Sequence, residues 1–268
     1  MQRSLRHASI TKAVAQPGLT SVEALVSLTG ASAVTIRRDL TDLESRGLVQ
    51  RKRGGAVRAP RRGVRTPFTA RYETGRAPKQ ALAAHVATLV ADDDSVILDN
   101  GTTCFAVAQE LVGRPLTVLA LSLHAAAVLA SRPGPTVLVP GGPVEVDSLA
   151  MVGSAALESV TETLADVLIL GACSASPAHG LSSSTHEDAR IKRAAIAAST
   201  RRVLVTTGEK LSQTSTFRFG TISDVTDLVT TSDAPPDLLR WFSDKGVVVH
   251  VVTTDPGDDP ADDGPDAP

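Results

Sequence analysis

The segment SAVTIRRDLTDLESRGLVQRKRGGAV, residues 32–57, constrains the fold more than any other part of this 268-residue chain. Ser32 is a good N-cap, and Ile36, Leu40 and Leu43 follow it at the spacing of one helix face. Two short strands around a Gly-Gly turn are then expected, with basic residues near the tip. A helix with exposed arginines followed by a basic hairpin is typical of a winged helix-turn-helix domain.

Two shorter helices are expected before this one. The first covers residues 5–15 and stops at a Pro-Gly pair. The second begins at TSVEALVSL, where Thr20 and Glu23 have the spacing of a capping box, and it ends at Gly30. A short helix, a turn that contains glycine and a longer helix together form a helix-turn-helix, so the third helix is the expected recognition helix.

The recognition helix and the hairpin supply the expected DNA contacts. Val34 and Thr41 mark the side of the helix opposite the apolar stripe, where side chains reach base edges. The hairpin tip is placed to contact the phosphate backbone, which adds affinity that does not depend on sequence. The alternative is a helical bundle with surface arginines. We expect the DNA-binding residues to be Ser32, Thr35, Arg37, Arg38, Arg51, Lys52 and Arg53.

The charge distribution supports a polyanion-binding module at one end of the chain. The formal net charge of the whole chain is -2, but residues 1–80 hold 16 of the 27 basic and 5 of the 29 acidic residues, a net of +11. The remaining residues carry a net of -13. A basic end joined to an acidic body indicates two parts with different tasks, with a solvated basic tail as the simpler alternative.

Beyond residues 1–57, the predicted DNA-binding domain, residues 58–74 are the expected linker, because their first half is rich in Arg, Pro and Gly. In residues 75–252, helical segments alternate with the apolar strands SVILD, LTVLAL, TVLVP, DVLILG, RVLVTT and GVVVHV. This alternation predicts an α/β domain with a largely parallel sheet and helices on both faces. Residues 253–268 are acidic and rich in Pro and Gly, and we expect a disordered tail.

The stretch ILDNGTTCFAVAQEL in this second domain predicts an anion site. A strand ends at Asp99 and runs through Asn100 and Gly101 into Thr102 and Thr103, which open a helix. Amides at a helix start point outward and the helix dipole favours negative charge there, so these residues can hold a phosphate group. The simpler alternative is a plain turn from strand to helix with threonine caps.

Both domains resemble the DeoR family of bacterial transcriptional regulators. VTIRRDLTDLESRGLVQRKRGGAV resembles the DNA-binding signature of that family. The order of PFTAR, Lys79, LDNGTT, LSL, VPGG, DSLAMVG, LILGA, GLSS, IKRAAI and TGEK resembles its effector-binding domain, which is similar to sugar-phosphate isomerases. The resemblance implies a cytoplasmic repressor, a dimer or tetramer without a cofactor, that binds a double-stranded DNA operator and responds to a phosphorylated sugar or related metabolite.

The resemblance also implies which residues bind the effector. It assigns the phosphate cradle to the Gly-Thr-Thr loop, a lysine to each of the motifs DARIKRAAI and TGEK, and a serine of LSL to the pocket wall. Lys210 is equally well explained as a surface lysine. The implied effector-binding residues are Asp99, Asn100, Gly101, Thr102, Thr103, Ser122, Lys192 and Lys210.

The chain departs from the family pattern at two places. Cys173 and Thr207 stand where the family often has aspartates, so two carboxylates are missing from the expected pocket rim and sugar recognition is expected to differ. His179, His186 and Glu187 flank this region and either replace the lost polar contacts or are exposed surface residues.

An isomerase with an appended DNA-binding domain is the alternative function. Isomerisation requires a positioned general base, and Asp99 and Glu187 are the obvious candidates, although neither belongs to a recognisable catalytic pair. We therefore predict a regulator without enzymatic activity. The two cysteines show no metal-ligand spacing, and no apolar run approaches the length of a membrane span, so neither a metal nor a membrane partner is expected.

Overall fold

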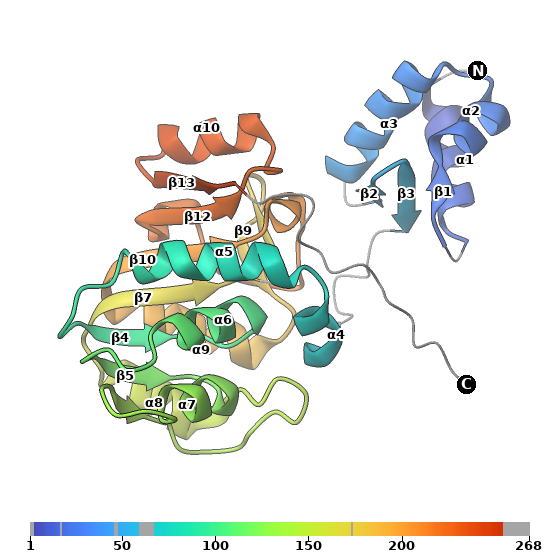
Figure 1. The fold of residues 1–268 in the computed structure, drawn as a ribbon. Helices are drawn as coiled ribbons and strands as arrows, with labels where there is room; N and C mark the ends of the chain where they lie inside the picture. The colour runs from blue at the N-terminus through green and yellow to red at the C-terminus, as the bar shows by residue number, and fades with distance from the viewer. Residues whose placement is uncertain (1–2, 17, 46–47, 59–66, 173, 254–268) are drawn as a thin grey trace, which may run out of the picture.

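The computed structural model describes residues 3–16, 18–45, 48–58, 67–172 and 174–253. Its first part combines three helices with a three-stranded antiparallel sheet in which the last strand lies between the other two (Figure 1). This is a winged helix-turn-helix, as predicted. Its elements are α1 (Arg3–Val14), β1 (Thr20–Ser21), α2 (Val22–Thr29), α3 (Ala33–Ser45), β2 (Val49–Lys52) and β3 (Gly55–Arg58).

The apolar stripe of α3 forms the centre of this domain. Ile36, Leu40 and Leu43 are at most 2% exposed and lie in one cluster with Ile10 of α1 and Leu25 of α2. The spacing i, i+4, i+7 therefore marks the face that packs onto the other helices, and the remaining faces of α3 are available to solvent.

A buried ion pair also fixes α3 against α1. Arg6 donates hydrogen bonds to the Asp39 carboxylate over 2.5 and 3.1 Å, and His7 Nε2 lies 2.9 Å from the same carboxylate. Burial alone would raise the pKa of Asp39, but the hydrogen bonds from Arg6 and His7 outweigh it and hold the pKa below its ordinary value. The carboxylate is therefore ionised at neutral pH and holds α1 against α3.

The predicted capping box of α2 is wrong. The helix α2 begins at Val22, so Thr20 lies one residue too early to be its N-cap. Ser21 is the N-cap instead, and its hydroxyl accepts the Ala24 amide over 3.1 Å. The predicted end of α2 is confirmed, because Gly30 has φ 67° and provides the left-handed cap.

The second part is built on a seven-stranded sheet in which every neighbouring pair is parallel. The strand order is β13-β12-β10-β7-β4-β5-β6. The predicted parallel sheet is confirmed, with β12 as a strand that the sequence pattern did not reveal. The strands are β4 (Ser95–Leu98), β5 (Thr117–Ala120), β6 (Thr136–Leu138), β7 (Ala165–Gly171), β10 (Ser199–Thr206), β12 (Asp227–Thr231) and β13 (Val248–Val252).

Helices cover both faces of this sheet, as predicted (Figure 1). Alternate strand residues point to opposite faces: Val203 and Val205 lie in the apolar cluster of α5 (Arg76–Ala87), α6 (Thr102–Glu110) and α7 (Leu123–Leu129). Leu204 lies in the cluster of the opposite face. That face is covered by α8 (Gly153–Thr161), α9 (His186–Ala197) and α10 (Pro236–Asp244).

A small antiparallel sheet, which the sequence pattern did not predict, lies beside the large one. It consists of β8 (Ser174–Ser176), β9 (Gly180–Ser183) and β11 (Phe217–Gly220) in the order β11-β9-β8. Two 3-10 helices, η1 (Gly208–Ser212) and η2 (Ile222–Asp224), accompany it. None of the described helices is long and apolar enough to cross a bilayer.

The predicted linker, residues 58–74, contains structure that the sequence pattern did not reveal. Arg58 belongs to β3, and residues 68–73 form α4 (Phe68–Glu73), which packs on the second domain through the buried Phe68. Composition marks the Pro- and Arg-rich first half but misses a short helix whose stability comes from tertiary contacts. Residues 59–66 of the linker and 254–268 of the tail lie outside the described residues.

Three strands of the large sheet are tied together at Asp227, the first residue of β12. Its carboxylate accepts hydrogen bonds from Arg201 of β10 over 2.7 and 3.1 Å and from Thr226 over 2.7 Å. His250 Nε2 of β13 lies 3.1 Å away. Burial opposes ionisation, but the hydrogen bonds from Arg201, Thr226 and His250 outweigh it and lower the pKa of Asp227 to about 2.

Replacement of this carboxylate should remove an acid-sensitive part of the stability. A folded-state pKa below the unfolded value of about 4 means that Asp227 favours the folded state above that pH and loses this effect as the pH falls toward 2. Asp227→Asn should therefore be less stable than the parent at pH 7, and the difference should narrow in acid. Urea unfolding from pH 7 to pH 3 measures this, with the exposed Asp237→Asn as control. If the difference in stability between parent and variant does not change with pH, Asp227 does not have the lowered pKa given above.

Candidate nucleic-acid interface and effector site

The amino-terminal half of α3 presents polar and basic side chains to solvent. Ser32 caps the helix by accepting the Thr35 amide over 3.2 Å, and the two hydroxyls lie 2.9 Å apart. Arg37 and Arg38 are both exposed. Because the buried stripe of α3 faces the other helices, these residues lie on the part of the domain that can enter a DNA groove.

The wing is braced against α3 by Arg51. Its backbone amide donates to Glu44 Oε1 over 2.8 Å, and its Nη1 donates to Thr41 Oγ1 over 2.9 Å. Lys52 and Arg53 are exposed on the hairpin. Arg51 thus has a structural contact in addition to its predicted role in DNA binding, which the sequence pattern did not distinguish.

Predicted DNA-binding residues of α3 and of the wing line a common hollow. Arg37, Arg51 and Lys52 line it together with Glu23 of α2. Side chains of α3 and of the wing therefore converge, although they are 14 or more residues apart in sequence. Three cations against one carboxylate make the hollow a suitable surface for a phosphate backbone.

The predicted effector residues lie where the order of the large sheet reverses. From β4 the chain builds β5 and β6 on one side and then returns to add β7, β10, β12 and β13 on the other. Ligands of open α/β sheets bind at such a switch point, outside the carboxyl ends of the strands. At this point Asp99 follows β4 and Gly171 ends β7. The Gly171 amide donates a hydrogen bond of 2.8 Å to the Asp99 carboxylate.

The first turn of α6 lies at this crevice. Gly101 is its N-cap with φ 108°, a conformation that favours glycine, and Thr102 and Thr103 are its first residues. Both threonines are buried, at 3% and 6% exposure. The amides at this helix start are those expected to form the anion cradle, and Asn100 is half-buried beside them.

A buried charge network lies beneath the cradle. Lys192 of α9 donates hydrogen bonds to the Asp99 carboxylate and to the Gly171 carbonyl, and its Nζ lies 3.6 Å from Asp188. Asn100 donates to Asp188 over 2.6 Å and to Asp99 over 3.3 Å. Burial raises the pKa of Asp99, while Lys192 favours its ionised form. Lys192 therefore neutralises Asp99. The Lys192 side chain is only 3% exposed, so little of it reaches the surface.

Two basic residues that the sequence motifs did not assign to the site lie near the cradle. A methyl group placed on Gly101 would be 3.9 Å from Nη1 of Arg71 in α4. Lys79 of α5 donates to the carbonyls of Arg71 and Thr74. Burial lowers the pKa of Lys79 to about 8, and the charges of Lys210 and Arg71 add to this effect while Glu209 opposes it. The motif PFTAR, which contains Arg71, and its spacing to Lys79 were the sequence signals that could have placed these two residues at the site.

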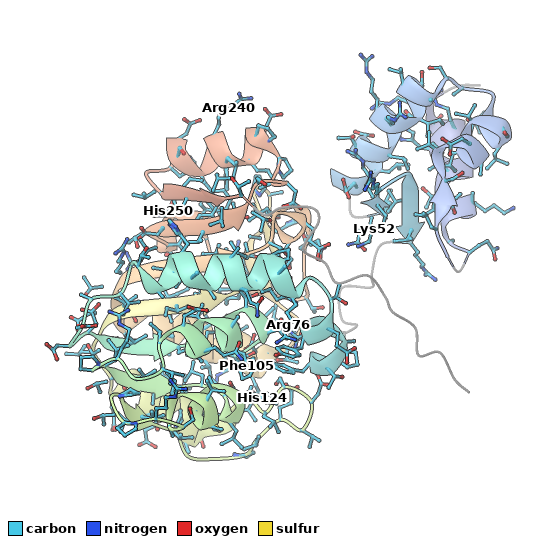
Figure 2. The ribbon with its side chains drawn as sticks, viewed as in Figure 1. Lys52, Arg76, Phe105, His124, Arg240 and His250 are labelled. Atoms are coloured by element: carbon cyan, nitrogen blue, oxygen red, sulfur yellow. The ribbon has the colours of Figure 1, made fainter. Side chains whose placement is uncertain are left out.

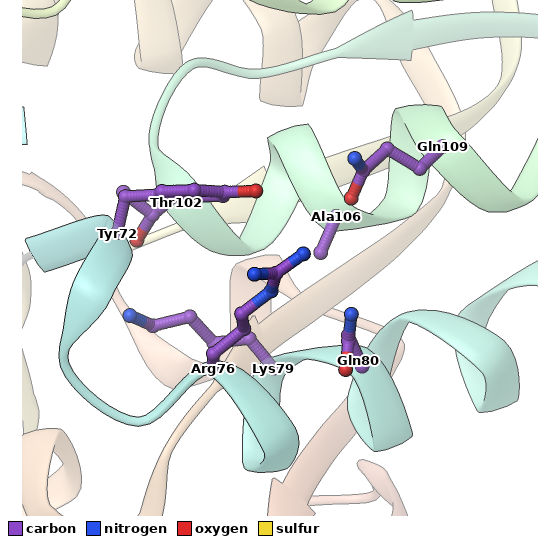
Figure 3. A pocket seen from close by; sticks show the side chains of 7 residues that line it. All are labelled: Tyr72, Arg76, Lys79, Gln80, Thr102, Ala106 and Gln109. Atoms are coloured by element: carbon purple, nitrogen blue, oxygen red, sulfur yellow. The ribbon is translucent and has the colours of Figure 1, made fainter. Parts of the chain in front are cut away.

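Figure 3 shows the pocket that adjoins these residues. Arg76 extends from α5 toward α6, which contributes Thr102, whereas Lys79 extends toward α4, which contributes Tyr72. Arg76 lies 5.7 Å from the centre of the Tyr72 ring. Two of the residues that line the pocket, Arg76 and Lys79, are cationic, although the surface that faces the pocket is mainly apolar.

The other predicted residues have varied surroundings. Ser122 is 2% exposed and caps α7 by accepting the Ala125 amide over 3.3 Å, which gives it a structural role. Thr207, at the carboxyl end of β10, has a buried hydroxyl with no hydrogen-bond partner in the described part of the chain. Cys173 lies outside the described residues. Of the residues proposed to replace the missing carboxylates, His179 and His186 are exposed and Glu187 is half-buried.

Both domains match known protein families. Residues 6–62 match the DeoR-like helix-turn-helix domain, and residues 75–232 match the DeoR C terminal sensor domain. The chain belongs to the DeoR family. It is therefore a DNA-binding transcriptional regulator with a sensor domain, as its sequence predicted.

Curated relatives within the family extend over nearly the whole chain. The glycerol-3-phosphate regulon repressor of Escherichia coli is 31% identical over 252 residues, which cover 94% of this chain and 100% of the relative. The HTH-type transcriptional repressor GlcR of Bacillus subtilis is 28% identical, with 97% and 100% covered. Among solved structures, ribose 5-phosphate isomerase A of Methanocaldococcus jannaschii is 16% identical with a TM-score of 0.38, covering 52% of this chain and 55% of that chain.

Arg38→Ala should reduce the preference of this DeoR-family regulator for its operator. Arg38 is exposed on α3, and removing one good base-reading side chain costs about 1–3 kcal/mol of discrimination. The measurement is the ratio of two affinities, one for an operator selected from random sequences and one for unrelated DNA. The exposed Arg240→Ala is the control. An unchanged ratio would show that this face of α3 does not read bases.

The double variant Lys52→Gln, Arg53→Gln should weaken operator and non-specific binding alike. For each phosphate group that the variant no longer neutralises, the plot of log affinity against log salt should become shallower by about 0.9. Arg51→Ala is the informative comparison, because it also removes the brace to Thr41 and should affect operator preference. A slope identical to that of the parent would place the wing outside the DNA interface.

Proposed function

We propose that this protein is a repressor whose affinity for its operator changes when a phosphorylated sugar or related metabolite binds to its sensor domain. The observation that carries the proposal is the start of α6 at the switch point, where Arg71 lies beside the N-cap Gly101 and Lys79 is bound to the carbonyls of Arg71 and Thr74. A phosphate group matches both features, since helix amides and nearby cations each favour negative charge.

The names of related proteins support the proposed role as a repressor. Its relatives in Escherichia coli and Bacillus subtilis are both named as repressors, and one of them is named for a glycerol-3-phosphate regulon. An effector acts by binding differently to the DNA-competent and incompetent states, with a coupling of about 1–3 kcal/mol. We further propose that the active form is a homo-oligomer, a dimer or tetramer, acting in the cytoplasm.

The geometry at the crevice favours a sensor over an isomerase. Asp99 is 1% exposed, and its carboxylate accepts hydrogen bonds from Lys192 and from the Gly171 amide. A general base must reach the proton that it removes from a bound substrate, and Asp99 is held below the surface by these partners. Glu187, the other candidate base, is half-buried at the start of α9 and lies 3.7 Å from His186 and 3.9 Å from Arg190.

Thr102→Asp should abolish the response to a phosphorylated effector, because it adds a like charge where the phosphate binds. Operator affinity is measured by fluorescence anisotropy with glycerol 3-phosphate, glucose 6-phosphate, ribose 5-phosphate and the corresponding unphosphorylated compounds. Thr102 is buried, so circular dichroism checks folding, and Lys210→Ala at a half-buried position is a second variant.

Two results would contradict the proposed function. One is a parent that responds equally to phosphorylated and unphosphorylated compounds. The other is a full phosphate-dependent response in both folded variants. Incubation of the parent with the same sugar phosphates, followed by a search for isomerised products, tests the enzymatic alternative directly.

A further inference from the structure

The helix α4 contacts the sensor domain on several sides. The Phe68 ring stacks on His124 of α7 with centroids 4.2 Å apart, and Tyr72 meets Phe105 of α6 edge to face at 5.5 Å. Phe105 and His124, both labelled in Figure 2, also meet edge to face with centroids 5.8 Å apart. Several aromatic contacts of this kind hold a short helix more firmly than its own backbone hydrogen bonds could.

Both ends of α4 are also held by hydrogen bonds. The Phe68 amide donates to the two carboxylate oxygens of Asp147 over 3.1 and 3.2 Å. At the other end, Lys79 donates to the carbonyls of Arg71 and Thr74, where a helix leaves its carbonyls unpaired. The helix is thus fixed at its first residue by one loop of the sensor domain and at its last turn by α5.

Arg71 is the residue of α4 that lies beside the anion cradle. Its Nη1 would be 3.9 Å from a methyl group on Gly101, the N-cap of α6. Its guanidinium also lies 5.8 Å from the centre of the Phe68 ring, within the same helix. A guanidinium offers several donors in a fixed plane that fits a phosphate group. A group held by the start of α6 is therefore within reach of a residue on α4.

We propose that Arg71 contacts the anionic group of the effector and that α4 thereby links the effector site to the segment leading to the DNA-binding domain. The inference rests on the proposed function, and it adds a binding residue and a route of communication. Phe68, the first residue of α4, lies two residues after residue 66, the last residue of the undescribed stretch between the domains. A shift of α4 caused by an anion bound to Arg71 would therefore reach the chain that leads to the DNA-binding domain.

The first test measures binding of inorganic phosphate and glycerol 3-phosphate to the full chain by calorimetry. Arg71→Ala should weaken both by roughly tenfold or more, the effect expected when a charge-assisted hydrogen bond is removed. Arg71→Lys keeps the charge without the planar donors and should be intermediate. The exposed Arg240→Ala is the control and should bind like the parent. Equal melting temperatures of the unliganded variants show that weaker binding does not come from unfolding.

The outcomes of this test separate the inference from the proposed function. A parent that binds neither compound contradicts the phosphate site and removes the basis of both. A different result overturns only the role of Arg71: the parent binds phosphate, Thr102→Asp does not, and Arg71→Ala binds as tightly as the parent. The proposed function then still stands.

The second test addresses the route through α4. Asp147 is exposed, so Asp147→Ala should fold while it releases the first amide of α4. Phosphate affinity should be retained, whereas the change in operator affinity caused by the most effective phosphorylated compound should shrink by roughly threefold or more. The exposed Asp237→Ala is the control. An undiminished response in Asp147→Ala would contradict the linking role of α4.

Discussion

A buried ion pair at the carboxyl edge of the sheet holds the sensor domain together where the effector is proposed to bind. Lys192 reaches from α9 to Asp99, which lies directly after β4. An isolated carboxylate in this position would be costly, and Lys192, Asn100 and the Gly171 amide together satisfy it. Since α6 begins three residues after Asp99, this network also fixes where the first amides of α6 point.

A comparable ion pair organises the DNA-binding domain. Asp39 of α3 is held by Arg6 and His7 of α1, next in sequence to the exposed Arg38. In both domains, buried charges are satisfied within the protein and fix a helix, while other charges remain at the surface to meet an anion. Removing one member of such a pair leaves its partner buried and uncompensated, which is why the pairs position their helices so firmly.

Local sequence signals predicted the parts of the fold that depend on local spacing. The stripe Ile36, Leu40 and Leu43 and the alternation of strands and helices indicated the winged domain and the parallel sheet. The capping box failed because α2 begins one residue later than predicted, directly after β1, whose pairing with β3 is a tertiary contact. The helix α4 was missed for the same reason, since its stability comes from Phe68 against His124 and Asp147.

The site residues divide along the same line. The loop from Asp99 to Thr103 was predictable because a strand end, a glycine and two threonines are adjacent in sequence. The burial of Lys192, the capping role of Ser122 and the approach of Arg71 to Gly101 depend on the packing of elements distant in sequence. Sequence motifs identified most of these residues as candidates but did not show which of them face a ligand.

Hydrogen exchange of the full chain, with and without the phosphorylated compound that most changes operator affinity, tests the central claim most directly. Binding at the switch point should slow exchange of the amides at the start of α6 and throughout α4, because both would be held by the bound anion. The corresponding unphosphorylated compound should leave these amides unchanged. Protection confined to other parts of the sensor domain would contradict the account.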